Sequence, residues 1–392
     1  MNTEDIKKAE EKYFINTFTR QPIVLDKGHG TVVYDIEGNK YLDFFAGIAV
    51  NNVGHTHPKV VNAIKKQAEK LIHISNIYYN KPTIELGEKL VKLSSFDKVF
   101  FANSGAEANE GAIKLALKYT GKNEIIATNN SFHGRTIATL TATGQDVYKK
   151  DFTKSLPQGF KHVPFGDIES IKNEITDNTA AILIEPIQGE GGVNIPPKGF
   201  FEELSKICEE NNILLILDEV QTGLGRCGTM FAHELFDVKP DIMTLAKALG
   251  GGVPIGAILT TNEIATGFNP GDHGTTFGGG PLICAAASAT LDAIVEEDLV
   301  ENSKNMGDYF KNKLLNLKDK YDLITEVRGY GLMIGIELTQ PCGEIVNDLR
   351  EKGFLVNCTA GKVLRFLPPL IISEEEINQL IDALDEEFEN LS

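Results

Sequence analysis

Short apolar runs alternate along the chain with segments of helical periodicity, and this alternation is the feature that most limits the possible folds. Six runs read as buried strands, at residues 99–101, 124–127, 181–184, 214–217, 242–245 and 255–260. Helical patterns fill most of the gaps between them. Such alternation predicts an α/β domain with a largely parallel sheet covered on both faces. In that architecture the ligand site lies at the carboxyl ends of the strands.

The two ends of the chain carry a different pattern. Residues 30–44 predict a hairpin with its turn at residues 37–39, while residues 291–317 predict a helix and residues 324–338 a strand interrupted by glycines. We therefore expect one large domain and a smaller α+β domain built from both termini. The expected boundaries place residues 56–290 in the large domain, with the small domain formed by residues 1–55 and 291–392.

The last helix has a clear start signal. Ser373 and Glu376 have the spacing of a capping box, in which each side chain bonds the backbone N–H near the other. The apolar residues that follow fall on one helical face, which we expect to be core. They are Ile377, Leu380, Ile381, Leu384 and Phe388.

Charge and composition exclude several classes of partner. The net charge of −17 over 392 residues would repel nucleic acid and anionic membrane surfaces, which are polyanions. No run of eighteen apolar residues predicts a membrane span, and residues 1–11 are too polar for a secretory signal. The five cysteines lack the close spacing of zinc or redox sites, so we expect no metal and a reducing cytoplasm.

A phosphate site is indicated where one strand meets a helix. Gly105 and Ala106 follow the run at residues 99–101 and open a helical pattern. The free N–H groups of a first helical turn, together with the helix dipole, can hold a dianion. An ordinary strand-to-helix turn has the same appearance. The segment matches neither the P-loop nor GxGxxG, which weakens nucleotide-binding and dehydrogenase interpretations.

Two further strand ends carry charged residues. Asp218 closes the run at residues 214–217, where its carboxylate could pair with a protonated ring nitrogen or simply cap a helix. Lys247 follows the run at residues 242–245 and precedes three glycines, which leave room for its amine to react with a carbonyl group. Most lysines are only solvated, so the context decides between these interpretations.

The segment that follows the run at residues 124–127 contains an aromatic ring and a guanidinium group. Phe132 could stack on a planar cofactor or fill the core. Arg135 could grip a carboxylate in bidentate fashion or remain a surface charge. His133 is interpreted as structural.

In order along the chain, these pieces resemble the class III pyridoxal-phosphate aminotransferases over nearly the whole length. The matching segments are S-G-A-E-A-N-E at 104–110, F-H-G-R at 132–135, E-P-I-Q-G-E-G-G at 185–192, D-E-V-Q-T-G at 218–223 and K-A-L-G-G-G at 247–252. The resemblance implies the fold type I architecture of aspartate aminotransferase, with a seven-stranded sheet in the large domain. It also implies pyridoxal 5'-phosphate as cofactor.

The resemblance assigns cofactor roles residue by residue. Lys247 is expected to form the Schiff base and Asp218 to pair with the ring nitrogen, so these two are the predicted catalytic residues. Gly105 and Ala106 are expected to hold the phosphate. The other cofactor contacts implied are Phe132, Glu219, Val220, Gln221 and, from a neighbouring subunit, Thr276. A homodimer with shared active sites is therefore expected.

Substrate roles follow in the same way. Segments at 73–76, 273–279 and 363–370 resemble family members of the arginine pathway that move an amino group from N2-acetylornithine to 2-oxoglutarate, giving glutamate. Arg135 and Thr275 are implied to hold the donor's carboxylate. Glu190 is implied to neutralise Arg365 until 2-oxoglutarate or glutamate brings a second carboxylate.

Alternative functions remain open at this stage. The same chemistry could act on succinyldiaminopimelate, ornithine or 4-aminobutyrate, since such specificity can rest on one or two contacts. Ile48 stands where ornithine aminotransferases resemble each other in having an aromatic residue, which weighs against ornithine. A different pyridoxal-phosphate reaction is a second class, and a non-catalytic binding protein is a third. The joint presence of Lys247, Asp218 and Arg365 argues against the third.

Overall fold

A seven-stranded sheet forms the centre of the computed structural model, which describes residues 1–391. Its strands are β4 (Lys98–Ala102), β5 (Glu124–Thr128), β6 (Phe160–Val163), β7 (Thr179–Ile184), β8 (Leu214–Asp218), β9 (Ile242–Leu245) and β10 (Gly256–Thr260). The order across the sheet is β4-β10-β9-β8-β7-β5-β6. Six strands run in the same direction, and β10 runs opposite to them, antiparallel to both β4 and β9. The predicted α/β fold with a mostly parallel seven-stranded sheet is confirmed.

The six expected strands are all present, with ends that differ from the expected ones by at most two residues. Strands β7 to β10 are buried on both faces, which explains their continuous apolar sequences. The sequence pattern missed β6. This edge strand contains Lys161 and His162 and is only partly buried, so it lacks the apolar run by which the others were found.

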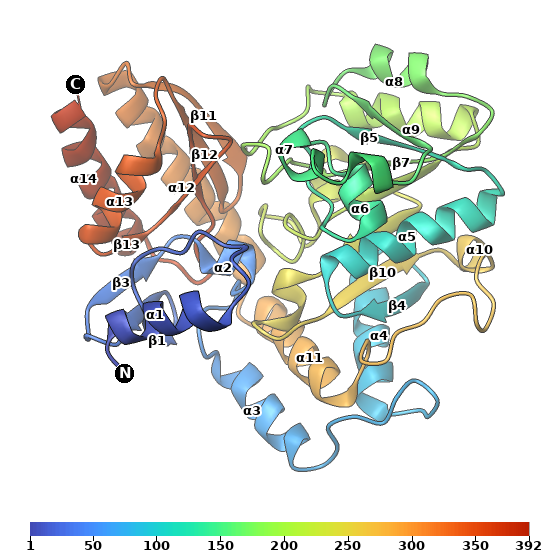
Figure 1. Cartoon of the computed structure of the whole chain (residues 1–392), viewed down its shortest axis with the longest axis horizontal. Coiled ribbons are helices and arrows are strands. Elements are labelled where there is room, and N and C mark those ends of the chain that lie inside the picture. The colour runs from blue at the N-terminus through green and yellow to red at the C-terminus, as the bar shows by residue number, and fades with distance from the viewer. Residues whose placement is uncertain (392) are drawn as a thin grey trace.

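Helices cover both faces of this sheet (Figure 1). They are α5 (Gly105–Thr120), α6 (Ile137–Ala142), α7 (Asp146–Lys149), α8 (Ile168–Glu174), α9 (Phe200–Glu210) and α10 (Asn262–Ala265), with short 3-10 turns η1 (Thr153–Ser155), η2 (Ala232–Phe236) and η3 (Lys247–Gly250). Strand residues alternate between the two resulting cores. Ile125 packs in the cluster with Ala112 of α5, whereas Ile126 packs in the cluster with Leu204 of α9.

Three helices, α3 (Pro58–Ala68), α4 (Lys81–Leu93) and α11 (Pro281–Glu296), pack together beside the sheet. The next helix, α12, spans Leu299–Lys320. The prediction of a single helix over residues 291–317 is therefore wrong. The chain breaks at Asp298, whose backbone is left-handed at φ 52°, a conformation that a continuing helix of L-residues does not adopt.

The remaining elements come from both ends of the chain. They are α1 (Thr3–Tyr13), β1 (Leu25–His29), β2 (Val32–Asp35), β3 (Lys40–Asp43), α2 (Ala46–Ala49), β11 (Ile324–Tyr330), β12 (Met333–Leu338), α13 (Gly343–Glu351), β13 (Phe354–Leu355), β14 (Asn357–Thr359), β15 (Val363–Phe366) and α14 (Glu374–Leu391). They form two four-stranded sheets, β1-β2-β3-β13 and β11-β12-β15-β14. The expected hairpin is β2 with β3. The single interrupted strand expected over residues 324–338 is wrong, because the chain turns back there and forms the antiparallel β11-β12 hairpin.

One strand pair joins the two ends. β3 pairs in parallel with β13, with Leu42 opposite Phe354. The N- and C-termini accordingly lie on the same side of the molecule, away from the middle of the chain (Figure 1). The expected capping box starts α14, since Ser373 and Glu376 bond each other's backbone. The domain boundaries near residues 55 and 290 stay a prediction.

Two further links stabilise this half of the molecule. The guanidinium group of Arg226 is buried and donates from Nη1 to the carbonyls of Leu332 (2.9 Å) and Pro368 (2.6 Å), and from Nη2 to Asn52 (2.5 Å). Burial lowers its pKa to about 9. A disulfide joins Cys342 to Cys358, a pairing that the cysteine spacing did not predict and that goes against the reducing setting inferred from that spacing. Within residues 1–391, the helices are all too short or too polar to cross a bilayer.

Candidate active site

A cavity of about 440 Å³ lies at the carboxyl ends of the parallel strands. The loops that line it follow five strands in turn, so sheet topology alone brings distant residues together. Its lining includes Gly105 and Ala106 after β4, Phe132 and Arg135 after β5, Glu185 and Glu190 after β7, Asp218, Val220 and Gln221 after β8, and Lys247 after β9.

The first turn of α5 can hold an anion at the cavity wall. Ser104 caps the helix by accepting from Glu107 N, which leaves the amides of Gly105 and Ala106 without an intrahelical acceptor. A Cβ on Gly105 would lie 2.8 Å from Val220 Cγ1. Only glycine therefore lets this backbone approach so closely. The arrangement fits a phosphate group held by amide N–H groups and the helix dipole.

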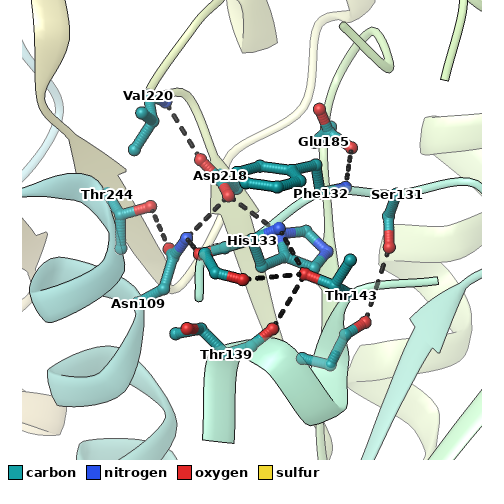
Figure 2. A network of polar contacts seen from close by, with 12 residues as sticks. Asn109, Ser131, Phe132, His133, Thr139, Thr143, Glu185, Asp218, Val220 and Thr244 are labelled. Atoms are coloured by element: carbon teal, nitrogen blue, oxygen red, sulfur yellow. Dashed lines mark hydrogen bonds and ion pairs between the residues drawn. The ribbon is translucent and has the colours of Figure 1, made fainter. Parts of the chain in front are cut away.

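Asp218 lies at the centre of a buried polar network (Figure 2). Its Oδ2 accepts from Asn109 Nδ2 at 2.7 Å and lies 2.8 Å from His133 Nδ1. Its Oδ1 accepts from Val220 N at 3.0 Å. Asn109 is itself fixed by Thr244, whose hydroxyl donates to Asn109 Oδ1 at 2.7 Å. This network holds one carboxylate rigidly at the cavity wall, where it can pair with a protonated ring nitrogen.

Glu185 is a second buried carboxyl group beside this network. Its Oε2 accepts from Phe132 N at 3.0 Å and its Oε1 from Gly189 N at 3.1 Å. Burial raises the pKa of Glu185 to about 7, although nearby His133 acts in the opposite direction. Glu185 therefore fixes the backbone that carries Phe132 and the loop that carries Glu190.

Lys247 begins η3, separated by one residue from the end of β9, with a left-handed backbone, φ 43°. Such a φ is unusual for a residue with a side chain and is typical of functional sites. Burial lowers the pKa of the Lys247 amine, with Glu190 opposing this effect and Arg365 adding to it. A lowered pKa increases the neutral fraction of the amine, which is the form that attacks a carbonyl group.

Phe132 and Arg135 are held by a residue outside the predicted set. Tyr148 of α7 packs edge-on against Phe132, with ring centroids 5.9 Å apart. The guanidinium carbon of Arg135 lies 3.8 Å from the Tyr148 ring centroid and 5.4 Å from that of Phe132. Cation–π stacking thus orients an exposed arginine at the mouth of the cavity.

An ion pair joins Glu190 of the cavity lining to the buried Arg365. Arg365 Nη1 donates to Glu190 Oε1 at 2.6 Å and to Gln221 Oε1 at 3.1 Å. A Cβ on Gly189 would lie too close to that amide oxygen, so glycine there makes room for Gln221. Burial opposes ionisation of Glu190, but Arg365 and Lys247 outweigh it and lower the pKa of Glu190. Glu190 and Arg365 therefore neutralise each other.

Four predicted residues are absent from the cavity lining. Arg365 reaches the cavity only through its hydrogen bonds to Glu190 and Gln221, which do line it. The Glu219 carboxylate accepts from the backbone N–H groups of Ala232 and His233 and is not part of the cavity lining. Thr275 accepts from Asn103 Nδ2 at 2.9 Å, one contact away from the cavity. Thr276 is exposed on the surface.

Sequence reasoning missed several residues that the structure places in the site. His133 was interpreted as structural, although it contacts Asp218, and Asn109 and Tyr148 were not singled out. Asn109 lies one helical turn after Gly105 on the helix that opens the phosphate site, and this spacing was an available signal. Tyr148 lies well beyond Arg135 along the chain, and no local pattern points to its ring.

Together, an anion-binding helix end, a carboxylate fixed for a ring nitrogen and a buried reactive lysine define an enzyme that works through an anionic, ring-bearing cofactor. Residues 14–388 match the family described as aminotransferase class-III, and the chain belongs to that family. It is an aminotransferase that uses pyridoxal phosphate.

The relatives of this chain include both acetylornithine and ornithine enzymes. It is 57% identical to an acetylornithine aminotransferase of Methanocaldococcus jannaschii over 99% of each chain. Among solved structures, it resembles an ornithine aminotransferase from Toxoplasma gondii with a TM-score of 0.96, at 34% identity over 100% of this chain and 96% of the other. It resembles an acetylornithine aminotransferase from Elizabethkingia anophelis with a TM-score of 0.89, at 37% identity over 100% of both chains.

Proposed function

We propose that this enzyme transfers the δ-amino group of N2-acetyl-L-ornithine to 2-oxoglutarate, giving N-acetyl-L-glutamate 5-semialdehyde and L-glutamate, as a step of arginine biosynthesis in the cytoplasm. The observation that carries the proposal is the ion pair of Glu190, which lines the cavity, with Arg365. The 57% identity to an acetylornithine aminotransferase supports the choice of donor.

The ion pair explains how one cavity accepts two different substrates. The donor reacts at a terminal CH2–NH2 group, whereas the reacting carbonyl carbon of 2-oxoglutarate is bonded to a carboxylate. With the donor bound, Glu190 compensates the charge of Arg365, since an unpaired buried charge is costly. With 2-oxoglutarate bound, Glu190 turns away and Arg365 binds the second carboxylate. The side chain of Glu190 is 24% exposed against 1% for Arg365, so Glu190 is the partner with room to move.

Other side chains orient the substrate and move protons. Arg135 binds the carboxylate at the end of the donor remote from the reacting amine. The neutral amine of Lys247 takes a proton from the substrate carbon that bears this amino group and delivers it two atoms away, in a 1,3-proton shift. Asp218 keeps the cofactor's ring nitrogen protonated. Pyridoxal phosphate, when bound, supplies the conjugated ring that accepts the electrons of the broken bond.

We also propose that the active unit is a homodimer. The segment at residues 71–79 and the neighbouring Phe277 form an exposed apolar surface, which we name the 71–79 surface. Its most exposed side chains are Tyr79 at 97%, Ile77 at 82%, Tyr78 at 68% and Phe277 at 64%. Asn76 links this segment to the Thr275 carbonyl at 3.0 Å. A second copy packed there would bury the patch and bring Thr276 to the partner's phosphate.

The experiment measures the two half-reactions separately, with the donor and with 2-oxoglutarate, for Glu190→Ala and for the control Glu202→Ala, which removes an exposed carboxylate paired with Lys206. We expect Glu190→Ala to shift the ratio of the two rates by about tenfold or more toward the acceptor, because Arg365 loses its counter-charge. An unchanged ratio would overturn the switch.

A second candidate donor is ornithine, which the TM-score of 0.96 to an ornithine aminotransferase favours. Acetylornithine, ornithine, succinyldiaminopimelate and 4-aminobutyrate can be compared by kcat/KM on the same preparation. A higher kcat/KM for another donor would mean that this donor, and not acetylornithine, is the preferred substrate. Repeated turnover without 2-oxoglutarate, beyond the single product molecule per active site that the donor half-reaction gives, would instead indicate a reaction other than transamination.

A further inference from the structure

Three consecutive residues of β14 connect the two partners of the Glu190–Arg365 pair. Asn357 accepts hydrogen bonds from the Arg365 side chain, and Thr359 donates its hydroxyl proton to the backbone carbonyl of Glu190 at 2.7 Å. Between them, Cys358 is tied by its disulfide to Cys342, the residue that precedes α13. β14 is thus anchored at its centre and contacts one partner from each end.

The contact with Arg365 is made by a neutral acceptor. Asn357 Oδ1 lies 2.7 Å from Arg365 Nη2 and 3.1 Å from Arg365 Nε. The two residues also face each other in the β14–β15 ladder. Arg365 therefore has two sets of partners: Glu190 and Gln221 bind Nη1, while Asn357 binds the other two nitrogens.

We propose that Asn357 is a positioning residue that determines acceptor specificity, because it holds Arg365 in place without neutralising it. This inference rests on the proposed role of Arg365. When Glu190 turns away, the hydrogen bonds to Asn357 keep the guanidinium group directed at the acceptor's second carboxylate. A carboxylate at position 357 would hold the same geometry but cancel the charge that the acceptor needs.

The test exchanges the amide for a carboxylate of the same shape. Asn357→Asp is compared with Asn347→Asp, a matched control because Asn347 Oδ1 also accepts from an arginine, Arg350, at 2.8 Å, but on the exposed surface of α13. The readouts are kcat and KM for the acceptor, KM for the donor, and the Kd of glutarate for the holoenzyme by calorimetry. Glutarate is a dicarboxylate without a reacting carbonyl group, so its binding reports the site apart from turnover.

We expect Asn357→Asp to raise KM for the acceptor and the Kd of glutarate by about tenfold or more, with a much smaller change in KM for the donor and in kcat. Asn357→Ala, which removes the hydrogen-bond acceptor without adding charge, is expected to weaken glutarate binding by a smaller factor. The control Asn347→Asp is expected to behave as the unsubstituted enzyme.

Equal changes in donor and acceptor constants, or glutarate affinity in both Asn357 variants within a factor of about two of the control, would overturn the proposal. Arg365→Leu separates this failure from a failure of the proposed function. If Arg365→Leu weakens glutarate binding strongly while the Asn357 variants do not, only the role of Asn357 is wrong. If Arg365→Leu also leaves glutarate binding unchanged, the assignment of Arg365 fails and this inference fails with it.

Discussion

Two polar networks at the cavity are built differently. We name the first the Asp218 wall (Asn109, His133, Asp218 and Thr244) and the second the Arg365 wall (Glu190, Gln221, Asn357 and Arg365). The Asp218 wall comes entirely from the ends of the central sheet and its helix α5, and its members are at most 4% exposed. The Arg365 wall combines two loops of that sheet with strands β14 and β15 from the other end of the chain.

This difference matches what each wall has to do. The charge on a ring nitrogen is the same in both half-reactions, so its partner gains from a rigid, fully bonded network. The donor and the acceptor differ in whether they have a second carboxylate. The Arg365 wall therefore has to present a different net charge to each substrate. A wall assembled from separate segments, with two partly exposed members, Glu190 and Asn357, allows such a change. Rigidity and adaptability are thus assigned to different parts of the chain.

The largest expected effect tests the rigid wall. Asp218→Asn should lower the rates of both half-reactions by roughly 100- to 1000-fold, because the ring nitrogen loses its charged partner at every step. Rapid mixing with the donor and with 2-oxoglutarate measures the two rates. Asp237→Asn, the same change at a left-handed position outside the cavity, is the control. A loss confined to one half-reaction would break the comparison between the walls.

The next effect concerns pH and the buried carboxyl group beside the Asp218 wall. The pKa of Glu185 is about 7 in the folded protein against an ordinary value of 4.5, so folding favours its protonated form. This contribution to stability is complete below about pH 4.5 and is lost as the pH rises through about 7. The decrease is roughly 3 kcal/mol at most. The free energy of unfolding, measured with a chemical denaturant from about pH 4.5 to about pH 7.5, should fall less for Glu185→Gln than for the unsubstituted enzyme.

Glu210→Gln is the matched control for that profile, since this carboxyl group is exposed at the end of α9. Its profile should follow that of the unsubstituted enzyme. If the free energy of unfolding depends on pH in the same way for all three proteins, Glu185 ionises in the folded state as it does in water.

The smallest expected effect concerns Arg135, which we propose binds a carboxylate of both the donor and the acceptor. Tyr148→Leu removes the ring on which the guanidinium group stacks, so we expect KM for donor and acceptor to rise together by about three- to tenfold, with kcat little changed. Tyr148→Phe retains the aromatic face and should keep both KM values. A rise for only one substrate would mean that Arg135 belongs to a substrate-specific wall.

The same division decided what could be predicted from the sequence. Asp218, Lys247 and Gly105 each follow a buried apolar run, so strand periodicity and topology were enough to place them in one crevice. Asn357 and Tyr148 lie in short elements with little periodicity, and their contacts depend on packing between distant segments. The edge strand β6 and the break at Asp298 escaped for a related reason, because a half-buried strand and a single left-handed residue leave weak local signals.

The parallel pairing of β3 with β13 also sets an order for folding during synthesis. Residues 40–43 leave the ribosome long before residues 354–355, whereas the strands of the central sheet all lie within residues 98–260. The central sheet can therefore form while β3 still exposes an unpaired edge, which is the kind of surface that promotes aggregation. The conformational entropy of closing the long loop between β3 and β13 is lost only after β13 has been synthesised. The Arg365 wall, which needs β14 and β15, is accordingly the last part of the catalytic cavity to be built.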